Sequence, residues 1–137
     1  MSDSIVTTYT EKRIVSQLGF YYPEFVVDLR NVEELQASHR VAYLLIGGKS
    51  TRSTLGAKWD RHLGILQMDV SVPVREGNGG RDEVCDFLAR IFNEHEATLT
   101  GDIRLRFKVP SQRDFGTLNG ESRKVVSVPY WVDVPTR

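Results

Sequence analysis

The clearest pattern along the chain lies in residues 58–72, which predict a long extended segment with a period of two in its second half. Leu66, Met68, Val70 and Val72 fall on one face of an extended backbone, and the residues between them fall on the other. A period of two is typical of a strand with one buried face. Because proline cannot donate to a strand ladder, the proline that follows predicts the end of this long strand.

Two later segments show the same period. The segment 103–109 alternates four apolar residues with Arg104, Arg106 and Lys108, which predicts a half-buried strand with one basic face. The segment 126–134 alternates valines and a tyrosine with other residues, and Pro129 inside it predicts an edge position or a bulge. The glycine-containing stretch 111–122 between them predicts a loop.

One segment has the period of a helix. After a turn-rich loop at residues 74–80, apolar residues recur at positions i, i+3, i+4, i+7 and i+8, which predicts an amphipathic helix covering the sheet. Asp82 and Glu83 lie in its first turn, where the helix dipole stabilises negative charge. The apolar positions are Val84, Phe87, Leu88, Ile91 and Phe92.

The first forty residues have a weaker pattern. Ser2 or Ser4 can cap a helix that runs to about Leu18, with Gly19 as its stop. Residues 25–29 predict a short strand or a packed loop. Residues 31–39 have a helical composition, but they are too few to form a helix independently.

The apolar run 41–46 predicts a buried strand that ends at Gly47 and Gly48, and Lys49–Ala57 predicts a loop. Together these elements predict an α+β fold, a mainly antiparallel sheet with helices packed on one face. The length of 137 residues fits one domain spanning 1–137, with its core in residues 41–135.

Composition narrows the function classes. Lys plus Arg and Asp plus Glu each total 18, so the net charge is zero, and a duplex-DNA binder usually has a basic excess. One cysteine allows neither an intrachain disulfide nor a cysteine-rich zinc site. No segment has the length of apolar residues that a membrane helix needs, and the N-terminus does not resemble a signal peptide. We therefore expect folding in a cytoplasm.

No catalytic or metal-binding set emerges from the motifs. GGKST at 47–51 resembles the end of a phosphate-binding loop, but the position that needs its first glycine is Tyr43. REGNGGRDE precedes a helix N-terminus, which is an anion site in nearly every helix. The three histidines fall in separate segments and are expected to be surface residues, and Cys85 is expected to be a small buried thiol. We predict no enzyme, no metal and no cofactor.

The outward positions of the strands instead suggest a binding surface. Arg104, Arg106 and Lys108 form a basic ribbon about 13 Å long at the rise of a strand, which suits a nucleic acid, an acidic partner or plain solvation. Tryptophans left uncovered on such a face favour protein contacts. The alternation yields nine candidate interface residues: Trp59, Arg61, Gln67, Asp69, Arg104, Arg106, Lys108, Trp131 and Asp133.

The stretch 59–133 resembles the tail terminator proteins of long-tailed bacteriophages. Its features are RHLGILQMDVSVPVREGNGG, then the helix RDEVCDFLARIF, then an alternating strand that ends in a proline, and finally RKVVSVPYWVDV. The first part of the family pattern is occupied by Arg61, Gly64, Leu66, Gln67, Met68, Asp69, Val70 and Pro73. Family members commonly begin with a plain amphipathic helix, whereas this N-terminus is richer in threonine and tyrosine.

The resemblance implies a structural virion protein with an α+β fold. Such subunits assemble into a hexameric ring on the end of the tail tube, stop its polymerisation and join it to a neck or head-completion protein. DNA passes through the ring without sequence-specific binding, and no membrane is involved. The expected location is the virion tail or neck, with host cytoplasm during assembly. The alternatives are another head–tail connector subunit and a small nucleic-acid-binding module.

Overall fold

The computed structural model describes residues 2–29, 39–52, 59–74, 79–99, 101–118 and 120–135. It contains two helices and seven strands in the described residues. In chain order the elements are α1 (Ser2–Tyr21), β1 (Val26–Leu29), β2 (Arg40–Arg52), β3 (Trp59–Pro73), α2 (Gly79–Phe92), β4 (Glu96–Leu99), β5 (Ile103–Phe107), β6 (Ser111–Leu118) and β7 (Glu121–Pro135).

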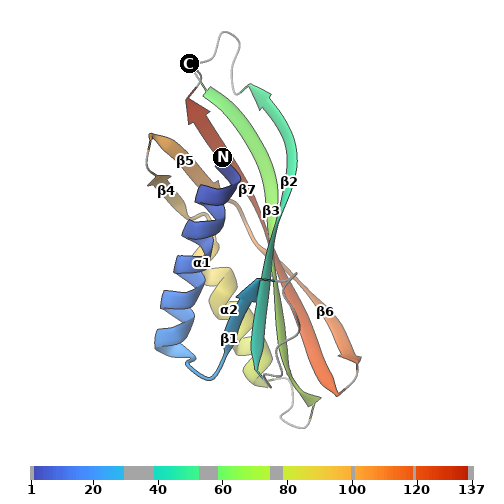
Figure 1. Cartoon of the computed structure of the whole chain (residues 1–137). Coiled ribbons are helices and arrows are strands. Elements are labelled where there is room, and N and C mark those ends of the chain that lie inside the picture. The colour runs from blue at the N-terminus through green and yellow to red at the C-terminus, as the bar shows by residue number, and fades with distance from the viewer. Residues whose placement is uncertain are drawn as a thin grey trace.

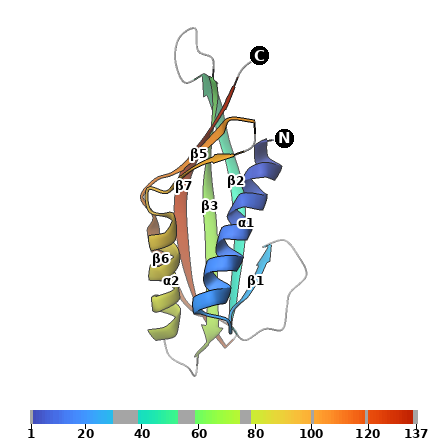
Figure 2. The same cartoon turned by 90° about the vertical axis from the view of Figure 1, so that its left-hand side faces the viewer.

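The strands form one twisted sheet in the order β1-β2-β3-β7-β5-β4. Strand β7 pairs with β3 along one edge, and its other edge pairs with β6 in its first half and with β5 in its second half. All pairs are antiparallel except β1 with β2. Both helices lie on one side of this sheet (Figures 1 and 2). The predicted α+β class, with helices on one face of a mainly antiparallel sheet, is therefore confirmed.

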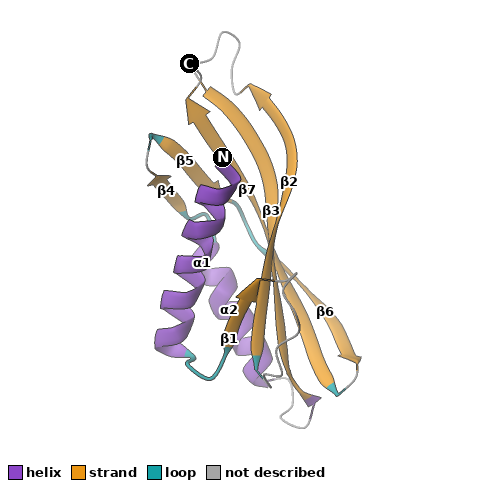
Figure 3. Ribbon diagram, in the orientation of Figure 1, coloured by secondary structure: helices purple, strands orange, loops and turns teal. Residues whose placement is uncertain are grey.

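The core lies between the helices and the sheet, and Figure 3 shows both helices on the same side of the strands. The alternation predicted for the long strand is confirmed, because Leu66, Met68, Val70 and Val72 are all buried on the helix side. The predicted α2 stripe is buried as well, apart from a half-buried Ile91. Neither described helix offers an apolar stretch able to span a lipid bilayer.

The N-terminal helix is longer than predicted, and Gly19 does not stop it. Helix α1 continues to Tyr21, and the Tyr22 amide still donates to the Leu18 carbonyl at 2.6 Å. The helix ends instead before Pro23, because the residue preceding a proline is disfavoured in helical geometry. Of the next predicted segments, the short strand at 25–29 is confirmed as β1, whereas residues 30–38 lie outside the described residues.

The predicted strand end at Gly47 and Gly48 is wrong. Strand β2 continues to Arg52, so residues 49–52 of the predicted loop are also strand, and 53–58 lie outside the described part. The glycines coincide with a register shift between Gly47 and Ser50 in the pairing with β3. Pairing with the long strand β3 continues on both sides of the two glycines, and a β-bulge accommodates the shift in register.

The predicted loop at 111–122 is also wrong, because most of it forms β6 in a hairpin with β7. Strand β6 is exposed along its described side chains, so no apolar alternation marks it. Strand β4 was not predicted either: it is a four-residue strand without a fully buried side chain.

Pro129 lies in a central strand, not in the edge strand or bulge that was predicted. Strand β7 has β3 on one side, while its other side pairs first with β6, up to Ser127, and then with β5 from Tyr130. Pro129 sits at this change of partner, where its carbonyl accepts from the Lys108 amide at 2.8 Å. Proline has no N–H to donate, and Pro129 lies between the part of β7 that pairs with β6 and the part that pairs with β5. The same crossover leaves Val109 exposed and outside β5, which ends at Phe107, so the predicted strand 103–109 is two residues too long.

Candidate functional site

All nine predicted interface residues belong to the face of the sheet that neither helix covers, here called the helix-free face. Positions 59, 61, 67 and 69 alternate with the buried positions of β3, and Arg61 pairs across the strands with Asp133. Arg104 also pairs with Asp133, and Arg106 pairs with Trp131. The period of two therefore assigned these residues to one face, and the strand order brought seven of them together.

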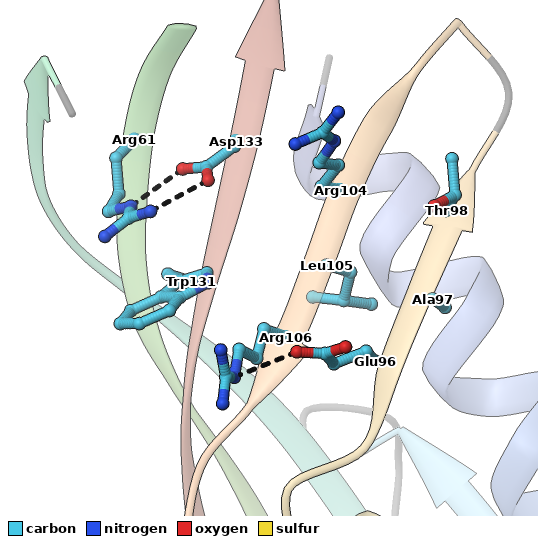
Figure 4. A pocket seen from close by; sticks show the side chains of 9 residues that line it. All are labelled: Arg61, Glu96, Ala97, Thr98, Arg104, Leu105, Arg106, Trp131 and Asp133. Atoms are coloured by element: carbon cyan, nitrogen blue, oxygen red, sulfur yellow. Dashed lines mark hydrogen bonds and ion pairs between the residues drawn. The ribbon is translucent and has the colours of Figure 1, made fainter. Parts of the chain in front are cut away.

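The seven residues form a basic cluster, together with Glu96 on β4. Trp131 on β7 lies at its centre, between Arg61 on β3 and Arg106 on β5 (Figure 4). The guanidinium carbon of Arg61 lies 4.0 Å from the centroid of the Trp131 ring, and that of Arg106 lies 5.6 Å away. The Lys108 Nζ atom is 4.8 Å from the same centroid. Three cations thus share one indole ring, each attracted by its π electrons.

Two carboxylates orient the arginines of the basic cluster. Asp133 accepts two hydrogen bonds from Arg61, from Nε at 2.8 Å and from Nη2 at 2.9 Å, in the bidentate geometry that suits a guanidinium. These bonds raise the pKa of Arg61, so its charge is permanent. Glu96 lies 3.2 Å from the Nε of Arg106. The two arginines are therefore held against Trp131 by carboxylates as well as by the ring.

The second tryptophan has its own cation. The guanidinium carbon of Arg104 lies 4.5 Å from the centroid of the Trp59 ring. Both tryptophans are half-buried, because these stacked cations cover part of their surface. The sequence left open whether Trp59 and Trp131 are exposed or packed, and the structure covers them in part with neighbours in the sheet, which the pattern of a single strand does not reveal.

The basic cluster surrounds a pocket of about 380 Å³ that opens on the helix-free face. Five of its nine lining residues are among the predicted interface residues: Arg61, Arg104, Arg106, Trp131 and Asp133. The cluster contains four cations and the two carboxylates of Asp133 and Glu96, so its net charge is +2. The cations are Arg61, Arg104, Arg106 and Lys108. The pocket can therefore receive anionic groups, and its arginines suit carboxylates or phosphates.

Gln67 and Asp69 lie farther along β3, outside the basic cluster. Asp69 is 5% exposed, and its Oδ2 atom lies 2.5 Å from Nη2 of Arg123. Its carboxylate therefore forms an ion pair between β3 and β7 and is not available to a partner. Sequence reasoning missed Glu96, which contributes to the cluster from the unpredicted strand β4.

The remaining candidate groups lie in separate segments of the described fold. His39, His62 and His95 are all half-buried, so none of them is the exposed surface histidine that was predicted. The Nε2 atom of His95 lies 2.5 Å from the Tyr9 hydroxyl. Cys85 is buried as predicted, and burial raises the pKa of its thiol to about 12. No group of three or more potential metal ligands occurs in the described part of the chain. The GGK of the phosphate-loop candidate lies in strand β2, in extended backbone.

The comparisons with known proteins bear on the fold. No protein-family model and no curated protein matches the sequence. A solved protein, whose designation states no function, has a similar structure with a TM-score of 0.71. The alignment covers 100% of this chain and 99% of that chain at 17% sequence identity. At this identity the likeness establishes a shared fold along the whole chain.

Proposed function

We propose that this protein is a ring-forming subunit that caps the tail tube of a long-tailed bacteriophage and joins it to the neck. The observation that carries the proposal is the helix-free face of the sheet, which combines tryptophan, arginine and outward aliphatic side chains. Trp and Arg are enriched at the centres of protein interfaces, and a solvated sheet face needs neither exposed isoleucine nor a cation-covered tryptophan.

The arrangement of the fold supports a ring. The two helices occupy one side of the sheet, so the helix-free face and the helical layer are different surfaces on opposite sides of the subunit (Figure 2). Contacts between two different surfaces are heterologous, and they close into a ring when the rotation between subunits allows it. The run from Arg61 to Pro73, followed by helix α2, is the part of the chain that resembles the terminator family.

The proposed partners follow from this role. They are other copies of the chain in a hexameric ring, the tail-tube protein at one surface and a neck or head-completion protein at the other, within the virion. DNA would pass through the ring without being read.

The test is tube capping. The tail-tube protein of the same phage is allowed to polymerise with and without the purified chain, and tube lengths are measured by electron microscopy. We expect short tubes with a ring at one end, and an added excess of tube protein should not lengthen them. Tubes that elongate normally at a saturating concentration of the chain would rule out a terminator. Binding to portal-bearing heads instead of tubes would identify another head–tail connector.

A second candidate, a small nucleic-acid-binding module, is favoured by the basic cluster alone. Arg104 and Lys108 are exposed, and aromatic rings beside cations are typical of single-strand binding. Such a module would retain single-stranded DNA on filters at low salt, with an affinity that falls steeply as salt rises. Absence of retention at low salt would eliminate it.

A further inference from the structure

The helix-free face is divided into two parallel parts of different chemistry. On β2 and β3, Ile46, Leu63 and Ile65 are 41%, 40% and 41% exposed, and we call them the apolar strip. Ile46 pairs directly with Ile65 across the two strands. Trp131 on β7 follows beside Leu63, and the basic residues of β5 follow beside Trp131. The face therefore changes from apolar to basic across four neighbouring strands, from β2 and β3 through β7 to β5.

Two cations on the basic side are not neutralised. Arg61 and Arg106 are held by Asp133 and Glu96. In the described part of the chain, Arg104 and Lys108 contact aromatic rings, but neither forms an ion pair with a carboxylate. Their charges are therefore available to an acidic group from outside the subunit.

The helical layer of the same chain carries the complementary chemistry. Phe20 and Tyr21, at the end of α1, are 77% and 58% exposed, which is unusual for large apolar side chains. The Tyr21 ring lies 5.4 Å from that of Phe87, so this apolar end lies directly beside α2. Helix α2 exposes Glu83 and Asp86 to solvent.

The two parts also adjoin one another on each surface. On the helix-free face, Leu63 of the apolar strip pairs with Trp131, whose ring contacts Arg106 and Lys108. On the helical layer, the Tyr21 ring lies 5.4 Å from that of Phe87, and the hydroxyl of the neighbouring Tyr22 donates to Glu83 at 3.1 Å. An apolar part beside a charged part thus occurs on both sides of the subunit.

We propose that the helical layer of a second copy of this chain docks on the helix-free face. Phe20 and Tyr21 of one copy cover the apolar strip, and Glu83 and Asp86 face Arg104 and Lys108. This inference rests on the proposed function and deepens it, because it names the surfaces that join neighbouring subunits. The apolar strip favours a protein occupant over a nucleic acid, since phosphates would leave it uncovered.

The experiment uses two charge-reversal variants of the full chain. The sheet variant carries Arg104→Glu and Lys108→Glu, and the helix variant carries Glu83→Lys and Asp86→Lys. Self-association is measured by sedimentation velocity over a wide concentration range at low salt. Each variant alone should associate at least about tenfold more weakly than the wild type, because like charges then face each other. An equimolar mixture should regain assembly, since both kinds of contact are again complementary.

Two controls separate docking from folding. Arg113→Glu reverses one charge on β6, outside the apolar strip and the basic cluster, and should assemble as the wild type does. Arg104→Gln with Lys108→Gln removes the charges without repelling Asp133, and should weaken assembly less than the reversal does. Thermal melts identify any variant that fails to fold.

Several results would overturn the inference. It fails if the wild type remains monomeric at every concentration, if either reversal leaves assembly unchanged, or if the mixture does not regain it. Loss of single-stranded DNA retention in the sheet variant, with unchanged self-association, would assign the basic cluster to nucleic acid. Tube capping separates this inference from the proposed function. Restored assembly without capping refutes only the terminator role, whereas capping that ignores the charge reversals refutes only this interface.

Discussion

Gly64 on β3 is required for space and not for backbone freedom. A Cβ atom added there would lie 2.5 Å from both Cζ and the hydroxyl oxygen of Tyr130 and 2.8 Å from Cε1, closer than such contacts occur. Tyr130 is 6% exposed and its ring lies 5.9 Å from that of Phe107, so it cannot move freely. We therefore expect Gly64→Ala to destabilise the protein.

The size of this effect is a balance of two terms. Overpacking a well-packed core costs about 1–3 kcal/mol. Replacing a strand glycine by alanine offsets this by about 0.5–1 kcal/mol, because the unfolded chain becomes less flexible. The net expectation is a loss of about 1 kcal/mol, equivalent to a melting temperature lower by about 4 °C.

The assay is urea unfolding followed by fluorescence, with Gly47→Ala as the matched control. Gly47 pairs with Gly64 across β2 and β3, but a Cβ atom there meets nothing within 4 Å, so this variant should be neutral or slightly stabilising. In a Tyr130→Ala background, Gly64→Ala should no longer lower the free energy of unfolding. A stabilising effect of Gly64→Ala in the wild-type background would refute the contact between the glycine and the ring.

Four further outcomes follow from individual polar side chains. Arg81→Met should lower the free energy of unfolding by about 1–3 kcal/mol, because it removes the hydrogen bond that the buried Arg81 guanidinium donates to the buried Ser122 hydroxyl. The hydrogen bonds that Asp114 accepts from Arg81 and Gly116 lower the pKa of its carboxyl. The stability of the wild type should therefore fall as acid protonates Asp114. Urea titrations from pH 6 to about 2 should show a flatter decline of stability for Arg81→Met than for the wild type. Cys85 should resist thiol reagents at pH 8 until the protein is unfolded, because burial raises its pKa to about 12. Burial, with Arg13 nearby, lowers the pKa of His95, so the unfolded state binds its proton first and stability should fall as pH drops below about 6.5, but not in His95→Phe.

The sequence by itself determined the features that depend on local periodicity. The alternation in 58–72 and 103–109 assigned each residue to a face, because successive side chains of a strand point to opposite sides whatever the partner strand is. The helical period of 84–92 likewise predicted which side of α2 is buried. Nine candidate interface residues could therefore be placed on one face before their neighbours were known.

Only the tertiary structure decided what those residues touch. The contact of Trp131 with Arg61 and Arg106 depends on the order β3-β7-β5, which joins residues about 70 and 25 positions apart along the chain. The polar strand β6 and the continuation of β2 through its glycines were missed for the same reason. Their backbones are extended because a neighbouring strand satisfies their hydrogen bonds, and no single segment records which neighbour that will be.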